Sequence, residues 1–145
     1  MSRLALLWKM LALGMIAALA GCTTTEAELR TGGAEHSTFH VNLPYALVLR
    51  NFQAGATKCF AGGTNGAYNT ITEVESSPGS VGRISITEFG PFGMSRALLV
   101  ADISAGNNGT EVEYFRHHIM IVDSAQPILA AWAAGLDKGC GLPFN

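Results

Sequence analysis

The sequence predicts an α+β fold, a two-layer sandwich in which two helices cover one face of an antiparallel sheet of four to five strands. Two amphipathic helical patterns, one after Pro44 and one around Pro127, flank a run of four strand patterns. Turn-length connections between those four strands indicate antiparallel neighbours. The order β-α-β-β-β-β-α then leaves both helices to cover the more apolar face. With 145 residues, the chain suits one domain.

The first 21 residues are typical of a signal peptide. Arg3 and Lys9 give a positive start, and an uncharged, mostly apolar run extends from Met10 to Ala20. An export signal needs this order of charge, apolar stretch and small residues. A retained transmembrane helix is the alternative, since about 20 apolar residues span a bilayer. However, the uncharged stretch here closes with Gly, Cys and three threonines.

The apolar run ends in Leu19-Ala20-Gly21-Cys22, which resembles the lipobox of bacterial lipoproteins at all four positions. The resemblance implies that signal peptidase II cuts between Gly21 and Cys22, and that Cys22 carries a diacylglyceryl group on sulfur and an acyl group on its new amino group. A thiol suits this step because thiolate is a soft nucleophile. Cleavage by ordinary signal peptidase after Ala18-Leu19-Ala20 is the alternative, and it would release a soluble protein.

Thr23 bears on the membrane in which the protein resides. Many inner-membrane lipoproteins of enteric bacteria carry Asp at this position, so the resemblance implies an outer-membrane anchor facing the periplasm. Without Arg3 and Lys9, seven basic residues stand against eleven acidic ones, a formal charge of −4. With no Lys/Arg cluster, this charge argues against nucleic acid as a partner. The expected partners are the membrane, through the lipid, and another envelope protein or peptidoglycan.

The three cysteines are Cys22, Cys59 and Cys140. Lipid on Cys22 leaves an even pair, which usually forms a disulfide in the oxidising periplasm. Cys59 follows the first predicted helix and Cys140 follows the last, so two helices on one sheet face would bring these ends together. A catalytic or metal-binding thiol is the alternative, but the chain lacks the close Cys and His spacing that metal sites need. We therefore predict a Cys59–Cys140 disulfide.

Residues 22–37 are rich in Thr, Gly, Ala and Glu without apolar periodicity, which predicts a flexible tether. The folded domain is then 38–145, beginning with a strand at Thr38–Val41. Pro44 is placed to start a helix. Apolar residues at helical spacing follow it and predict the buried stripe of this helix: Tyr45, Val48, Leu49, Phe52, Ala56 and, one turn later, Cys59.

Four strands and a helix complete the prediction. Alternating or dense apolar residues predict the strands Ala67–Glu75, Arg83–Phe89, Ala97–Ser104 and Thr110–Ile121. Gly106-Asn107-Asn108-Gly109 is a hairpin loop, because Gly and Asn tolerate positive φ. The last helix has Pro127 in its first turn. Asp123 or Ser124 is its expected cap, Gly139 its expected stop, and its buried stripe is Ile128, Ala131, Trp132 and Gly135 or Leu136.

This layout resembles the helix-grip-like domains of some envelope lipoproteins, including those attached to the outer-membrane assembly machinery. The resemblance is one of architecture alone, so it implies no functional residues.

The residues that could carry chemistry have simpler structural explanations. In a strand, His36 and His40 would lie roughly 13 Å apart, and the neighbours His117 and His118 would point to opposite faces. Glu73 and Glu75 fit a solvated sheet face, as do Glu88, Glu111 and Glu113, although paired carboxylates could also serve acid–base catalysis. Ser80 lacks the spacing of a nucleophile elbow. We expect no catalytic site, no metal and no cofactor.

Three functions stay open from the sequence. The first is a non-enzymatic, lipid-anchored envelope protein that acts as a binding or accessory module. The second is a carrier of a small ligand, such as a lipid or a peptidoglycan fragment, held in a groove between sheet and helices. The third is an envelope hydrolase. A filled core favours the first, an empty apolar cavity the second, and a deep pocket lined by polar groups the third.

Overall fold

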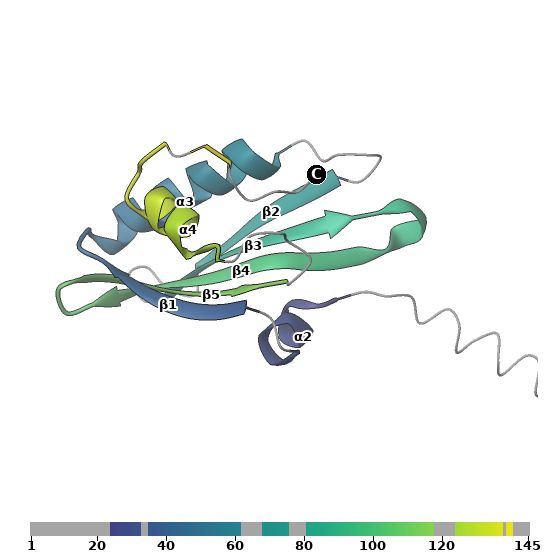
Figure 1. Cartoon of the computed structure of the whole chain (residues 1–145), viewed down its shortest axis with the longest axis horizontal. Coiled ribbons are helices and arrows are strands. Elements are labelled where there is room, and N and C mark those ends of the chain that lie inside the picture. The colour runs from purple at the N-terminus through teal and green to yellow at the C-terminus, as the bar shows by residue number, and fades with distance from the viewer. Residues whose placement is uncertain are drawn as a thin grey trace, which may run out of the picture.

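The fold is the predicted α+β sandwich, and its described residues include one helix, α2 (Glu26–Thr31), that the sequence pattern did not predict (Figure 1). A computed structural model describes residues 24–32, 35–61, 68–75, 81–117, 124–137 and 139–140. Five antiparallel strands form one open sheet in the order β1-β5-β4-β3-β2. The elements along the chain are α2 (Glu26–Thr31), β1 (Glu35–Val41), α3 (Tyr45–Phe60), β2 (Tyr68–Glu75), β3 (Val81–Phe89), the 3₁₀ turn η1 (Pro91–Gly93), β4 (Ser95–Gly106), β5 (Gly109–Arg116) and α4 (Gln126–Ala133).

Helices α3 and α4 cover one face of the sheet, and α2 lies on the other (Figure 1). The strands β1 and β2 form opposite edges of the sheet although they are neighbours in the chain. Helix α3 connects them, and its 16 residues extend roughly 24 Å. Five strands span about 19 Å from edge to edge, so one helix of this length suffices for the crossing.

The core between α3, α4 and the sheet contains the predicted residues. Val48 and Phe52 of α3 are fully buried, and Trp132 of α4 is 3 % exposed. They pack in one cluster with the inward-facing residues of the sheet, and Ile128 packs against that cluster while partly exposed. The sheet residues of the cluster include Ile84, Ile86, Leu99, Ala101, Ile103, Val112 and Tyr114.

Helix α4 differs from its predicted form at both ends. Its N-cap is Ala125, which makes no side-chain cap, while the Ser124 hydroxyl accepts a hydrogen bond from the Gln126 amide at 3.2 Å. The helix ends at Ala133, well before Gly139, because Gly135 takes the left-handed conformation that stops it. The buried residues are accordingly Leu129, Ala131, Trp132 and Ala133, and Leu136 is exposed.

The segment 22–37, predicted to be a flexible tether, contains α2 and the first residues of β1. Thr25 caps α2 in a capping box with Glu28. Leu29 is 2 % exposed and packs on the outer sheet face against Ala97, Val100 and Phe115. One buried residue in six gives no periodic signal, which is why the sequence pattern did not predict this helix.

An ion-pair network also holds α2 to the outer face of the sheet. The Arg30 guanidinium lies 2.7 Å from the Asp102 carboxylate and 4.7 Å from the centre of the Phe115 ring. Asp102 also accepts a 2.7 Å hydrogen bond from Arg83. This bond raises the pKa of the Arg83 guanidinium. Glu26 lies 3.8 Å from Arg83. The outer face is therefore charged and partly covered by α2.

The hairpin between β4 and β5 is the predicted one. Gly106 pairs with Gly109 across a two-residue turn, Asn107-Asn108. Gly109 has φ +143°, and a Cβ there would lie 2.4 Å from the Val41 carbonyl oxygen. This glycine is required both by its backbone conformation and by the close approach of β1.

Candidate functional site

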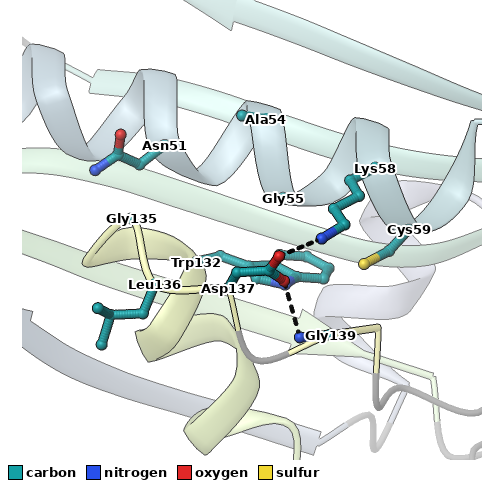
Figure 2. Close-up of a pocket in the computed structure, with 10 residues that line it drawn as sticks. All are labelled: Asn51, Ala54, Gly55, Lys58, Cys59, Trp132, Gly135, Leu136, Asp137 and Gly139. Atoms are coloured by element: carbon teal, nitrogen blue, oxygen red, sulfur yellow. Dashed lines mark hydrogen bonds and ion pairs between the residues drawn. The ribbon is translucent and has the colours of Figure 1, made fainter.

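A surface hollow of about 230 Å³ lies where the C-terminal half of α3 meets the end of α4 (Figure 2). Ala54, Gly55 and Lys58 line it from α3, and the chain following α4 closes it with Leu136 and Asp137. Its floor includes Trp132. The hollow thus lies between the two helices, on the outside of the core.

Gly55 determines how closely α3 and α4 approach one another. A Cβ at this position would lie 2.4 Å from Cγ of the Trp132 indole, which is far too close for any side chain. The indole therefore packs directly on the backbone of α3. It also meets two aromatic rings of α3 edge to face, Phe52 at 5.6 Å and Phe60 at 6.0 Å between ring centres, an arrangement that aromatic quadrupoles favour.

The rim of the hollow is formed by the C-terminal end of α4. The Gly135 amide donates to the Trp132 carbonyl at 2.9 Å, and the Leu136 amide donates to the Ala131 carbonyl at 2.8 Å. This is the Schellman pattern of helix termination. Asn51 of α3 donates to the Ala133 carbonyl at 3.3 Å, so one helix caps the other.

Lys58 and Asp137 form the charged part of the hollow. Their ammonium and carboxylate lie 2.6 Å apart, and the side chains are 56 % and 72 % exposed. The hydrogen bond from Lys58 is the largest cause of a lowered pKa for Asp137, and the Gly139 amide adds a second bond at 3.2 Å. Both groups remain open to solvent, so this exposed pair contributes little to stability and is accessible to a partner.

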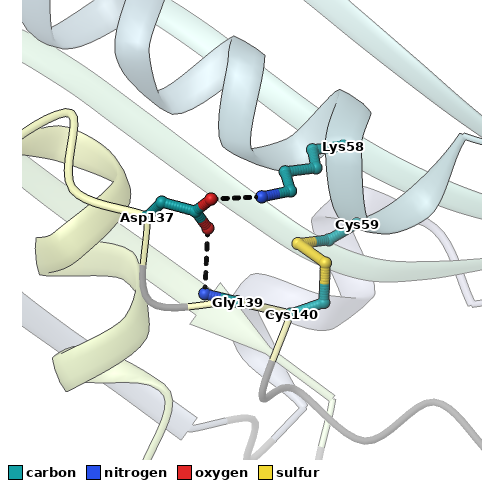
Figure 3. The surroundings of a disulfide bond; sticks show 5 residues. All are labelled: Lys58, Cys59, Asp137, Gly139 and Cys140. Atoms are coloured by element: carbon teal, nitrogen blue, oxygen red, sulfur yellow. Dashed lines mark hydrogen bonds and ion pairs between the residues drawn. A yellow bond between two sulfur atoms is a disulfide. The ribbon is translucent and has the colours of Figure 1, made fainter.

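The predicted disulfide lies beside this ion pair (Figure 3). Cys59, in the last turn of α3, is bonded to Cys140, and their Cα atoms are 5.1 Å apart. The bond ties the segment after α4 to the end of α3 across 81 residues of sequence. It therefore closes one wall of the hollow covalently.

A second polar cluster, Glu35 with Tyr114, Arg116 and Ala125, lies at the β1 edge of the core. The Glu35 carboxylate accepts hydrogen bonds from the Tyr114 hydroxyl at 2.7 Å and the Ala125 amide at 3.1 Å. It also forms an ion pair with Arg116, which lies opposite it on β5 and is 2 % exposed. One carboxylate thus joins the edge strand, its neighbour and the start of α4.

The protonation states of this cluster follow from its contacts. Burial acts to raise the pKa of Glu35, but the bonds from Tyr114 and Ala125 and the charge of Arg116 outweigh it, so the pKa is lowered. Burial, with the bond to Glu35, raises the pKa of Tyr114 to about 12. At neutral pH the cluster is therefore an ionised carboxylate bound by a neutral phenol and a guanidinium.

Glu35→Gln should lower the free energy of unfolding at pH 7 by about 1–3 kcal/mol, because a buried guanidinium loses its charged partner. A lowered pKa means that the carboxylate stabilises the fold above the ordinary glutamate range and that this contribution is lost as the pH falls. The difference between Glu35→Gln and the unsubstituted chain should therefore shrink below pH ~4. Urea denaturation at several pH values measures this difference in the free energy of unfolding.

The control is Glu111→Gln, at an exposed position on β5. An equal loss of stability in that variant would contradict the role of Glu35.

Sequence reasoning overlooked this cluster, although a signal for it existed. Arg116 is in phase with Val112 and Tyr114 on the strand, so a period of two places it on the inner face. A buried guanidinium needs a carboxylate partner. That carboxylate is Glu35, which lies opposite Arg116 in the register between β1 and β5. The sequence alone does not show this register.

The histidines and glutamates considered from the sequence lie mostly on the outer sheet face. His36 stacks on Phe115 with 4.5 Å between ring centres and lies 2.8 Å from Glu113. The His40 ring lies 3.2 Å from the Asn108 carbonyl, and Glu88 pairs with Arg96. His118, Ser80 and the side chains of Glu73 and Glu75 lie outside the described residues.

Within residues 24–140, gaps excluded, no three His, Cys, Asp or Glu side chains come together as metal ligands. No helix in that part of the chain has the length and apolarity to cross a membrane. Comparison with known proteins also yielded no relative: no family model and no curated protein matches the chain.

Proposed function

We propose that this chain is a lipid-anchored protein of the cell envelope, attached to the outer membrane through Cys22 and acting as a non-enzymatic binding or accessory module. The lipobox-like sequence Leu19-Ala20-Gly21-Cys22 after an apolar run is the observation that carries the proposal. This sequence follows two basic residues, Arg3 and Lys9, and an uncharged apolar run, which is the order that an export signal requires.

The bonding of the other two cysteines supports this proposal. Cys59 and Cys140 are joined to each other, which leaves Cys22 as the thiol for lipid. Disulfides persist in oxidising compartments such as the bacterial periplasm. An exported, lipidated chain and a disulfide-bonded domain therefore imply the same compartment.

The packing between the layers favours a binding module over a carrier. A carrier would hold its ligand between sheet and helices, where Val48, Phe52 and Tyr114 are fully buried and pack in one cluster. The hollow between α3 and α4 lies outside that core and is smaller than the roughly 300–1,000 Å³ of typical ligand pockets. Its exposed Lys58–Asp137 pair and the neighbouring Leu136 suit contact with the surface of another envelope component.

The lipid anchor is tested by intact-mass analysis of the protein purified from membranes. The mature chain should begin at Cys22 and carry three acyl chains, or two in bacteria that leave the amino group free. Cys22→Ala should abolish both lipidation and processing by signal peptidase II, because the nucleophilic thiol is lost. Density-gradient fractionation should place the unsubstituted protein in the outer membrane.

A double variant, Cys59→Ser with Cys140→Ser, is the matched control, since it removes two thiols but leaves the lipobox. It should still be lipidated. A Cys22→Ala precursor that is processed and membrane-bound as before would refute the anchor.

A further inference from the structure

The chain is fixed to the sheet almost immediately after Cys22. Thr24 forms a parallel bridge beside Arg96 at the start of β4. Its amide donates to the Ser95 carbonyl at 3.2 Å, and its carbonyl accepts from the Ala97 amide at 2.8 Å. Leu29 and the Arg30–Asp102 ion pair continue this attachment along α2. The folded part therefore begins two residues after the proposed lipid.

Two residues leave little freedom between anchor and domain. Even fully extended, they reach only about 7 Å. The end of the sheet where β4 begins must then lie close to the membrane surface. In Figure 1 the start of α2 and the turn between β3 and β4 lie toward the same end of the molecule.

The turn at that end has an apolar, uncharged sequence. Gly90-Pro91-Phe92-Gly93-Met94 connects β3 to β4, and no charged residue lies between Glu88 and Arg96. The Gly90 amide donates to the Met94 carbonyl at 2.9 Å, which closes the turn. The Met94 side chain is 41 % exposed, one of three large exposed apolar side chains among the described residues. Pro91 is exposed as well.

The hairpin at the opposite end of β4 has the contrasting composition. Its turn is Asn107-Asn108, both exposed and polar. The 12 residues of β4 separate the two turns by roughly 40 Å. Of the two turns that flank β4, the apolar one thus lies beside the anchor and the polar one lies at the opposite end of the strand.

From these observations we propose that the β3–β4 turn, Gly90–Met94, rests on the lipid surface and inserts Met94 among the headgroups. The inference rests on the proposed lipidation of Cys22. Apolar side chains enter the boundary between headgroups and acyl chains, and the depth there is about 5–10 Å. The neighbouring charges, Glu88 and Arg96, pair with each other, so the contact requires no anionic lipid. The Asn107-Asn108 hairpin then points away from the membrane.

Tryptophan fluorescence in vesicles tests this orientation. The lipidated mature protein is reconstituted into phosphatidylcholine vesicles that carry bromine on the acyl chains near the headgroup. Met94→Trp introduces a reporter at the turn, and Val81→Trp, at a position also exposed, introduces one near the far end of β3. Val81 pairs with Ser104, roughly 30 Å along β4 from Ser95. Trp132, the other tryptophan of the proposed mature chain, is 3 % exposed, so the unsubstituted protein supplies the background.

We expect bromine to quench the Met94→Trp reporter several-fold more strongly than the Val81→Trp reporter. Pro91→Trp repeats the measurement at the same turn if Met94→Trp fails to fold.

Equal quenching of turn and far-end reporters in a protein whose mass shows the lipid would overturn the orientation while leaving the anchor intact. Absence of the lipid from the mass spectrum would instead refute the proposed function. Met94→Trp combined with Cys22→Ala, in a chain expressed without residues 1–21, should lose the quenching, because a single turn provides too little apolar area to bind alone.

Discussion

Trp132→Ala should lower the free energy of unfolding by about 3–5 kcal/mol, the range for large aromatic truncations in a packed core. The Trp132 side chain is 3 % exposed and stands edge to face with Phe52 and Phe60. Gly55 leaves the backbone of α3 bare beneath the indole. Gly55 has no side chain that could move into the cavity left by alanine.

Urea denaturation measures this loss in a chain expressed without residues 1–21 and with Cys22→Ala, which carries neither the signal segment nor the lipid. Phe52→Ala should behave alike, since Phe52 is fully buried in the same cluster. Leu136→Ala is the control, because Leu136 is 56 % exposed just beyond the same helix and should change stability by less than about 0.5 kcal/mol. Unchanged stability in both aromatic variants would mean that the two-layer core is wrong.

Removing the disulfide should have a comparable effect. Cys59→Ser with Cys140→Ser opens a loop of 81 residues, and the chain-entropy model assigns about 4–5 kcal/mol to closing a loop of that length. The loss arises in the unfolded state, which regains the freedom that the bond removes. Thermal or urea unfolding of the double variant, compared with the unsubstituted protein, gives the value.

Reduction of the unsubstituted protein provides the matched control for the disulfide. With a thiol reductant present, the unsubstituted chain should become as unstable as the double variant, while the double variant should not respond. Non-reducing peptide mapping should find Cys59 and Cys140 cross-linked. Two freely alkylatable thiols in the native, unreduced protein would contradict the pairing.

Periodicity alone determined the elements of the main core. Tyr45, Val48, Leu49, Phe52 and Ala56 recur at helical spacing, and all are buried in α3. Strand alternation placed Ile84 and Ile86 on one face in the same way. These predictions held because a helix or strand that buries one face must repeat its apolar residues at its own period, whatever it packs against. The Cys59–Cys140 pairing followed from the same layout, because both helices had to cover one face.

Tertiary structure decided the features that depend on a single residue and a distant partner. Helix α2 buries only Leu29, and one apolar residue in six has no period. The ion pair of Glu35 with Arg116 depends on the register between β1 and β5, two strands far apart in the chain. Glycine is unfavourable in the interior of a helix, and the presence of Gly55 in α3 is explained only by the Trp132 indole that packs on it. Sequence patterns report the face that an element buries; the contact made by one particular side chain depends on the strand register and helix packing that only the folded chain provides.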